Sequence, residues 1–430
     1  MDFTFDGSIS RQVLNNYLSR AVTHTGLGMD NFSPSQTFED DLRMLIYEGA
    51  KFIGRASFVW EETHESEHFA VACKRAEKTH EADPEMILQA CVFECINKSF
   101  VDTIPVAAWV FEDFGLPVVS RNFSYDRMLN PSGMYVDHWH KNCSVQDITQ
   151  LESRMWIYYR ACSYILAGYE GIHFGQVHLI GGADEGFRYW KETVGMIRAF
   201  AKQHARRHYV LCDAHTHGIE VDGEMLFDYN AWPLRLKEII EEPMKCILEE
   251  GYYDSIYGHS KGGRSPSGWT AESMPFLVEL DNFGGSRFSG EPRHDSHYAW
   301  GYDEITWYCL QTREYRHQFL RYIWNWVRSR YPEGWVQMPS RRLITEKVEF
   351  IWDNPDCVWL DQVAENEFLN YTLDEAGNAH IRRNYYSANN QSDTCPFGYG
   401  DEDVIKECFA HPEGVLTKEE GYYEAVQRKD

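Results

Sequence analysis

The spacing of apolar residues along the chain predicts two helices near its start. Residues 8–25 carry apolar side chains at helical intervals, and Ser8 or Ser10 can cap the first turn. A second helical pattern covers 38–48 and ends at Gly49. We therefore expect the chain to begin with a helical segment.

Eight short apolar segments with strand character follow, and helical patterns separate several of them. The predicted strands are 52–60, 86–94, 171–179, 208–214, 225–229, 254–258, 276–281 and 298–303. The predicted helices are 65–82, 150–167, 187–206, 234–250 and 304–330. Strand followed by helix, repeated along a chain, predicts a parallel sheet with helices outside it. Eight such strands over roughly 250 residues are typical of an α/β fold, the (β/α)8 TIM-type barrel.

A doubly wound open sheet is the alternative architecture for the same pattern. The barrel is favoured because no glycine-rich phosphate loop follows the first predicted strand. The chain then has three parts. Residues 1–50 form an N-terminal helical segment packing on the barrel, 51–330 form the barrel with a long second-crossover insertion at 97–170, and 331–430 form a C-terminal extension. An insertion of that length in a compact domain is usually functional.

Charge and aromatic content narrow the classes of ligand. Lys and Arg total 41 and Asp and Glu total 66, which gives a net charge of −25. A chain this acidic is a poor candidate for binding nucleic acid or an anionic membrane. The 14 Trp and 26 Tyr residues offer apolar faces with polar edges, which suit sugars. We therefore expect a carbohydrate substrate as the partner, and the sequence is compatible with a homo-oligomer.

Cysteine usage and the N-terminus indicate the compartment. The 11 cysteines are scattered and match neither a disulfide framework nor a zinc ribbon. The acidic N-terminal stretch lacks the basic and apolar regions of a signal peptide. No apolar run reaches the ~18 residues that a transmembrane helix needs. We therefore expect a cytoplasmic protein without a membrane segment, a cofactor or a metal.

Polar residues at the ends of the predicted strands are the candidate site residues, because barrel sites lie at the carboxyl ends of strands. Side chains alternate between the two faces of a strand. Glu279 and Asp281 therefore share the face opposite the apolar Val278, and we expect them to point into the barrel mouth. Asp213 shares a strand face with His215 in the same way. The structural alternative for these acids is an ion pair with an inward cation such as Arg55 or Lys261.

Paired carboxylates across an aromatic-lined mouth are what glycoside hydrolysis requires, because one protonates the leaving oxygen and the other attacks or activates water. The candidate catalytic residues are Asp213, Glu279, Asp281 and Glu94. The candidate substrate contacts are Trp60, Gln176, His178, His215, His259, Lys261, Trp300, Tyr302 and Asp303. Either Asp303 or Glu304 can instead cap the helix predicted from 304, since acids favour helix N-termini.

The barrel pattern with acids at these strand ends resembles the large clans of (β/α)8-barrel glycoside hydrolases, over about residues 50–330. In those clans the acid/base ends the fourth strand and the nucleophile ends the seventh. The resemblance implies Asp213 as the acid/base, Glu279 as the nucleophile, and a role in carbohydrate metabolism. The clans typically carry an Asn-Glu pair at the fourth strand, where this chain has Cys212-Asp213. The resemblance does not single out one family.

Two other functions remain open. The motif Asp213-Ala-His-Thr-His217 resembles the metal-dependent amidohydrolase and phosphoesterase barrels. Its imidazoles, His215 and His217, lie two residues apart and can bind one metal, with His259 and Asp281 as later ligands. Those families place the motif on the first barrel strand, whereas half of this chain precedes it. The remaining alternative is a non-catalytic carbohydrate-binding barrel.

Overall fold

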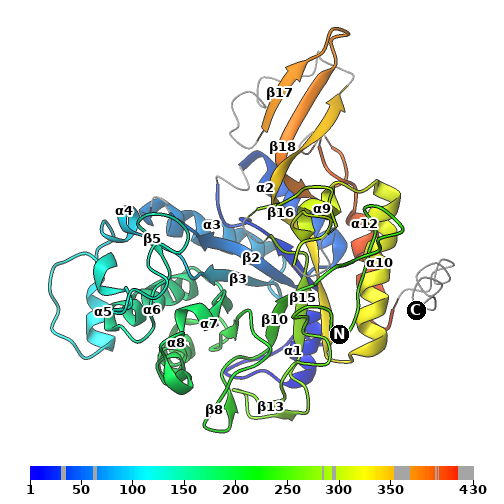
Figure 1. The fold of residues 1–430 in the computed structure, drawn as a ribbon. Helices are drawn as coiled ribbons and strands as arrows, with labels where there is room; N and C mark the ends of the chain where they lie inside the picture. Colours follow the sequence, from blue (N-terminus) through cyan, green and yellow to red (C-terminus); the bar gives the residue numbers. More distant parts are fainter. Residues whose placement is uncertain are drawn as a thin grey trace.

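Eight parallel strands form a ring at the centre of the molecule (Figure 1). In ring order, which is also chain order, they are β1 (Ala21–His24), β2 (Phe52–Val59), β3 (Ile87–Val92), β6 (Gly171–His173), β7 (Leu211–Asp213), β10 (Asn230–Pro233), β15 (Phe276–Glu279) and the first part of β16 (Gly334–Trp352). β1 pairs with both β2 and β16, and a parallel bridge between His215 and Ala231 joins the β7 and β10 segments. The ring is therefore a (β/α)8 TIM-type barrel, as the sequence predicts.

The computed structural model describes residues 1–30, 35–61, 65–282, 285–292, 297–352, 369–392, 395 and 397–414. The main helices around the ring are α1 (Arg11–Leu18), α2 (Ser35–Glu48), α3 (Glu65–Ala82), α6 (Leu151–Leu166), α8 (Arg188–His204), α9 (Glu304–Cys309), α10 (Arg313–Arg330) and α12 (Glu402–Ala410). No helix in these ranges is long and apolar enough to cross a membrane.

Smaller elements fill the connections between the barrel strands. The short helices are α4 (Lys98–Val101), α5 (Ala108–Asp113), α7 (Val177–Ile180) and the 3-10 turns η1 (Tyr125–Arg127) and η2 (Glu185–Phe187). Four two-stranded ladders pair β4 (Ile96–Asn97) with β5 (Cys143–Ser144), β8 (Glu220–Val221) with β9 (Glu224–Met225), β11 (Lys237–Glu238) with β12 (Cys246–Ile247), and β13 (Gly263–Arg264) with β14 (Thr270–Ala271).

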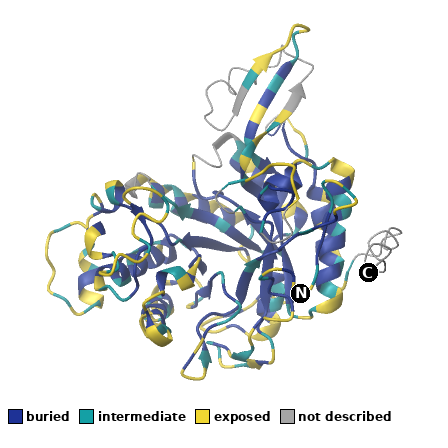
Figure 2. Cartoon of the chain, viewed as in Figure 1, coloured by how far each residue is buried: buried dark blue, intermediate teal, exposed yellow. Residues whose placement is uncertain are grey.

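Apolar patterning explains why these segments take their forms. All six residues of β3 are buried, as expected for a barrel strand that is covered on both faces. In α8, the buried Trp190, Val194, Ile197 and Ala201 recur at helical intervals and form one apolar stripe. Figure 2 shows the resulting pattern, with buried strands at the centre and exposed outer helix faces.

The barrel covers a longer part of the sequence than predicted, because it includes a strand from each of the two flanking segments. β1 lies inside the stretch predicted as the helix 8–25, and helix α1 ends at Leu18. The eighth strand, β16, begins at Gly334, within the predicted C-terminal extension 331–430. β1 has only four residues, which are too few to show the alternation of a strand. Val22 also lies at a helical interval from the apolar residues of α1, so the pattern predicted a longer helix instead of β1. The limits 51 and 330 are therefore wrong as the ends of the barrel.

Two predicted strands are absent from the barrel, and a third is displaced. Residues 254–258 form turns and irregular backbone, and 298–303 form a tight turn closed by an isolated bridge between Ala299 and Tyr302. Ile256, Tyr257 and Trp300 are nevertheless buried. The segment 225–229 precedes β10 and does not form it. A short apolar run can belong to a buried loop as well as to a strand, so periodicity alone does not separate the two.

The predicted long insertion is present between β3 and β6. It contains α4, α5, η1 and β5 and leads into α6, and it forms a lobe at one side of the barrel (Figure 1). β5 pairs antiparallel with β4, which follows β3 directly. This ladder places residues of the insertion beside the carboxyl end of β3.

β16 continues beyond the barrel into a three-stranded arm. Its outer part pairs antiparallel with β18 (Ala379–Ser387), which pairs in turn with β17 (Leu369–Leu373). The arm projects away from the ring at the top of Figure 1. The C-terminal region is thus partly barrel wall and partly an extension.

Candidate active site

Four charged side chains meet at the carboxyl end of the barrel. Glu279 ends β15, and Asp281 follows it on the same face. Arg55 donates to Glu279 through Nε (3.1 Å) and Nη2, and its Nη2 lies 3.3 Å from Asp281 Oδ1. Arg342 of β16 donates to Glu279 Oε2 and Asp281 Oδ1, both at 2.8 Å. Thr23 of β1 adds a hydrogen bond to Glu279 at 2.7 Å.

The backbone of β2 explains how Arg55 reaches the acids. Arg55 has a φ of 56°, in the left-handed region, and the β2–β3 register shifts between Ile53 and Ser57. An irregularity of this kind turns a strand residue away from the regular alternation of side chains. Of the two cations predicted as partners for the acids, Arg55 is therefore correct and Lys261 is wrong, since Lys261 pairs with Glu220 at 3.1 Å.

The two arginines determine the charge of both carboxylates. Burial raises the pKa of Glu279, but Arg55 and Arg342 outweigh burial and hold this pKa well below its usual range. The pKa of Asp281 is lowered as well: burial raises it, and Arg55 and Arg342 lower it. Glu279 is therefore an anion at neutral pH, which suits a nucleophile or a stabiliser of positive charge and does not suit a proton donor.

A buried aspartate–histidine pair lies beside this cluster. His173 ends β6, and its Nδ1 is 2.7 Å from Asp213 Oδ2 at the end of β7. The amide of Gln89 donates to Asp213 Oδ1 at 2.7 Å. The ring of His215 lies 4.8 Å from that of His173 and brings its Nε2 to 3.9 Å from Glu279 Oε1. Among the described residues, neither histidine Nε2 has a hydrogen-bond partner, although both atoms are buried.

Sequence patterns alone do not indicate His173, Gln89 or Arg342 as site residues. The predicted strand 171–179 runs past the end of β6 at His173, which is why Gln176 and His178 are the candidates from this strand. Gly175, with a φ of 57°, marks the actual end of the strand. Arg342 lies on β16, which the sequence does not predict as a barrel strand, so its position beside Glu279 and Asp281 is seen only in the closed barrel.

A second group lies at the edge between β3 and β6. Glu94 accepts hydrogen bonds from the backbone N–H of Gln176 (2.9 Å) and from its side-chain amide (3.2 Å). Trp60 packs edge-on against Trp139, with ring centroids 4.9 Å apart. The indole N–H of Trp139 donates to the backbone carbonyl of Glu94 at 3.1 Å. The structure thus brings together Glu94, Gln176 and Trp60 from the predicted set.

The other predicted substrate contacts bond elsewhere in the protein. Trp300 is buried, and its indole N–H donates to the Lys245 carbonyl. Asp303 is fully buried and caps α9 by accepting from the Thr306 N–H, which confirms the capping role expected for one of two acids. The polar groups of both residues bond to protein, and their contact with substrate stays a prediction. His178, His259 and Tyr302 also take part in local contacts, namely His178 with Thr216, His259 with His217, and Tyr302 with Ala299.

The two histidines of the predicted metal motif do not act as a pair. The ligand atoms of His215 lie within 4.8 Å of those of Glu279 and Asp281, whereas His217 packs on Trp232 at 4.6 Å. Two guanidinium groups already bond to both carboxylates. A divalent cation there would meet two fixed positive charges, so the residues at this position do not fit a metal.

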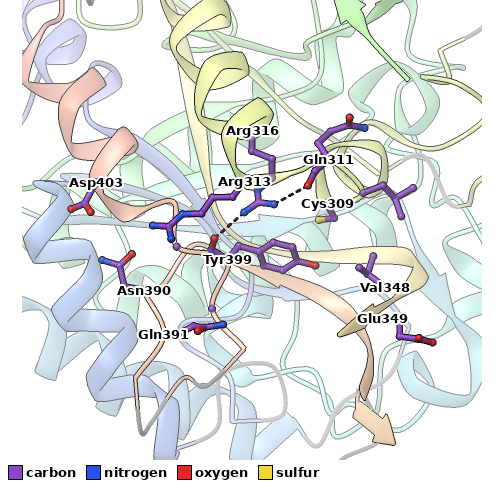
Figure 3. Close-up of a pocket in the computed structure, with 13 residues that line it drawn as sticks. Cys309, Gln311, Arg313, Arg316, Val348, Glu349, Asn390, Gln391, Tyr399 and Asp403 are labelled. Carbon is purple, nitrogen blue, oxygen red and sulfur yellow. Dashed lines mark hydrogen bonds between the residues drawn. The ribbon is translucent and has the colours of Figure 1, made fainter. Parts of the chain in front are cut away.

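A separate cavity of about 730 Å³ lies between α9, α10 and residues 390–391 and 398–403 (Figure 3). Arg316, on its wall, donates to the carbonyls of Gln311 and Tyr399 and forms a two-pronged ion pair with Asp401. None of its lining residues belongs to the barrel-mouth groups described above.

Comparison with known proteins gives structural neighbours only. No protein-family model and no curated protein sequence matches the chain. Its fold is similar to the acarbose-soaked Nostoc punctiforme debranching enzyme, at 10% identity, with 92% of this chain and 82% of that chain covered and a TM-score of 0.42. An Anoxybacillus alpha-amylase, whose structure is described as providing insights into a new glycosyl hydrolase subclass, is similar at 10% identity. The match covers 92% of this chain and 79% of that chain, with a TM-score of 0.42.

The native form of the same debranching enzyme is similar at 11% identity and a TM-score of 0.30, and covers 54% of this chain. In that alignment the chain spans about half of the enzyme, 53% of its length. At these scores the barrel assignment rests on the strand pairing of the chain itself, and the neighbours are glycoside hydrolases that share the architecture.

Proposed function

We propose that this protein is a glycoside hydrolase whose reaction takes place around Glu279. The observation that carries the proposal is an anionic carboxylate that two arginines hold near His215, whose ring lies 4.8 Å from the buried His173 that Asp213 orients. Hydrolysis of a glycosidic bond needs a carboxylate at the anomeric carbon and a group that moves a proton to the leaving oxygen.

Glu279 is assigned to the anomeric carbon. Its depressed pKa keeps it ionised, and Oε1 faces the open Nε2 of His215. Asp281 accepts hydrogen bonds from the same two arginines, so its negative charge weakens the electrostatic effect of these arginines on Glu279. We assign Asp281 as a positioning residue.

The proton-transfer group in this proposal is His173. Gln89 donates to one oxygen of Asp213, and His173 Nδ1 lies 2.7 Å from the other, so we assign Asp213 to orient the imidazole. An imidazole held at Nδ1 by a carboxylate can accept and return a proton at Nε2. Glu94 is the alternative donor, and both of its oxygens accept hydrogen bonds from Gln176.

Carbohydrate is the proposed substrate. The half-buried Trp60 and Trp139 offer aromatic surface beside Glu94, where a sugar ring could stack. The cytoplasmic location remains part of the proposal, and it agrees with the free thiols of all ten described cysteines.

The test is turnover of aryl glycosides and oligosaccharides by the purified protein. We expect Glu279→Gln to lower kcat by at least about 10³-fold, and His173→Asn by about 10²–10⁴-fold. Glu39→Gln, on the exposed face of α2, is the matched control and should change nothing. Full turnover in Glu279→Gln would refute the assignment.

Azide distinguishes a reacting carboxylate from a structural one. With an activated aryl glycoside, azide should restore release of the phenolate by Glu279→Ala, because its nitrogen bonds to the anomeric carbon as the phenolate leaves. The glycosyl azide product is identified by mass spectrometry. Tight sugar binding with no turnover on any substrate would instead support a binding-only barrel.

A further inference from the structure

Four metal-ligating side chains from three separate segments converge outside the carboxylate cluster. Cys95 follows β3, His140 and Cys143 belong to the insertion, and Glu61 follows β2. Cys95 Sγ lies 3.3 Å from Cys143 Sγ, and His140 Nε2 lies 3.1 Å from Glu61 Oε1. The ligand atoms of Glu61, His140 and Cys143 all lie within 4.8 Å of one another.

The backbone holds the two ligands of the insertion in place. The Cys143 N–H donates to the His140 carbonyl at 2.9 Å, which closes a tight turn between them. Asn142, inside this turn, has a φ of 63° and donates its N–H to Asp137 Oδ1 at 2.7 Å. Cys143 also pairs with Asn97 in the ladder that follows Cys95.

The orientation of His140 is compatible with metal binding through Nε2. Its Nδ1 lies 3.1 Å from the Lys141 carbonyl oxygen. When Nδ1 carries the ring proton and donates it there, Nε2 presents its lone pair toward Glu61 and Cys143. Metal-binding histidines are commonly held by a backbone carbonyl in this way.

Two pairs of these ligand atoms have separations close to those around zinc, and Cys95 approaches the group through Cys143. Around a tetrahedral zinc, two sulfurs at about 2.3 Å from the metal lie about 3.8 Å apart, and a nitrogen and an oxygen lie about 3.3 Å apart. The separations of 3.3 Å and 3.1 Å are within about 0.5 Å of these values. A disulfide would need its sulfurs about 2.05 Å apart.

We propose that Glu61, Cys95, His140 and Cys143 form a zinc site. Four protein ligands fill a tetrahedral shell and leave no position for substrate, so the site is structural. Three of the ligands directly follow residues of the second group at the barrel mouth: Glu61 follows Trp60, Cys95 follows Glu94, and His140 follows Trp139. Zinc would therefore tie the insertion to β2 and β3 and hold these three residues in position.

The metal content of the full-length protein tests the site without reference to activity. After purification without chelating resin and reconstitution with zinc, we expect one zinc per chain by mass spectrometry. Cys143→Ser and Cys95→Ser should lose it, and Cys73→Ser, on α3, should retain it. If a cysteine variant does not fold, His140→Ala serves in its place, with an expected fall in zinc affinity of at least about tenfold.

Cobalt and thiol chemistry give the opposing outcomes. Cobalt(II) should produce a thiolate charge-transfer band that Cys143→Ser abolishes. Two results would overturn the proposal: a protein that binds neither zinc nor cobalt, or a disulfide between Cys95 and Cys143 found in the isolated protein.

The effect on the barrel mouth rests on the proposed function and has its own readout. Removal of zinc should raise KM for oligosaccharides more than it lowers kcat, since the ligands position Trp60 and Trp139. Stoichiometric zinc without any turnover would leave the metal site standing and count against the hydrolase.

Discussion

Single buried charges in this protein depend on the groups packed around them. Glu279 and Asp281 are nearly buried, with exposures of 6% each, and remain anions because Arg55 and Arg342 lie against them. Removing one partner of a buried ion pair costs more than the pair contributes, because it leaves an uncompensated charge.

Arg342→Met should therefore destabilise the fold by about 3–5 kcal/mol at pH 7. The lowered pKa of Glu279 contributes stability above its unfolded-state value, and that contribution is lost as the pH falls through the folded-state pKa. The difference between wild type and variant should thus narrow below about pH 4. Urea unfolding at pH 7 and pH 3.5 measures it. Arg382→Met, which breaks an exposed pair with Glu349, should not move the midpoint, and an equal shift in both variants would contradict the argument.

Glu48 is the opposite case, a buried acid with no cation bonded to it. Neither of its oxygens has a hydrogen-bond partner among the described residues. Burial, aided by the nearby Glu402, raises the pKa of Glu48 well above its usual value. The folded protein then holds a proton there that the unfolded chain releases above about pH 4.5, so this group makes the protein less stable as the pH rises.

Glu48→Gln should raise the free energy of unfolding at pH 8 by at least about 1 kcal/mol, because each pKa unit corresponds to about 1.4 kcal/mol. At about pH 3.5 the gain should nearly vanish, since wild-type Glu48 is then largely protonated in both the folded and the unfolded state. Denaturant curves at the two pH values check this. Glu39→Gln on the same helix should show no change, and a gain of equal size at both pH values would exclude the titration as its cause.

At the scale of elements, β16 has two roles along its length. Its first residues complete the barrel beside β1, and its outer residues pair only with the arm. Val348 and Arg383 lie opposite each other in the antiparallel register. The arm beyond that pair contacts no barrel strand by backbone pairing in the described part of the chain.

Replacing residues 349–382 with Asn-Gly should therefore leave the barrel folded, since that dipeptide suits a two-residue hairpin turn. We expect the Tm to change by less than about 3 °C, which corresponds to about 1 kcal/mol. A shorter variant that joins Arg341 directly to Ser387 deletes Arg342 and should lose the acid cluster. Calorimetry and turnover compare the two, and equal loss in both would show that the arm supports the barrel.

Element by element, the sequence predicted strands best where the apolar run was long and buried on both faces, as in 86–94. It failed at β1, which is four residues long, and at β16, where the barrel strand runs straight into the arm without a turn. Loop residues such as Ile256 and Tyr257 were predicted as a strand because they are apolar. They are apolar because they are buried, and burial does not require pairing in a sheet.

For the molecule as a whole, the net charge of −25 causes repulsion between like charges, which destabilises the folded state. Added salt screens charges that lie more than about 10 Å apart at 0.1 M. Most surface ion pairs contribute little, so the screening of repulsion should dominate.

The Tm at pH 8 should therefore rise by about 2 °C or more when NaCl increases from 10 to 300 mM. The comparison should be repeated with sodium sulfate at equal ionic strength, to separate screening from the general effect of salts on hydrophobic burial. A Tm that falls with salt would mean that the ion pairs outweigh the repulsion.

Local patterns in the sequence were enough to predict the barrel architecture and the two carboxylates of the site, Glu279 and Asp281. Alternation along 276–281 is enough to place Glu279 and Asp281 on one face, because the period of a strand needs only neighbouring residues. Pairing across the ring requires its closure. His173 meets Asp213 across 40 residues, Arg342 meets Asp281 across 61, and Cys95 meets Cys143 across 48. No period in the sequence encodes those separations, since they follow from the register of eight strands and the path of one insertion.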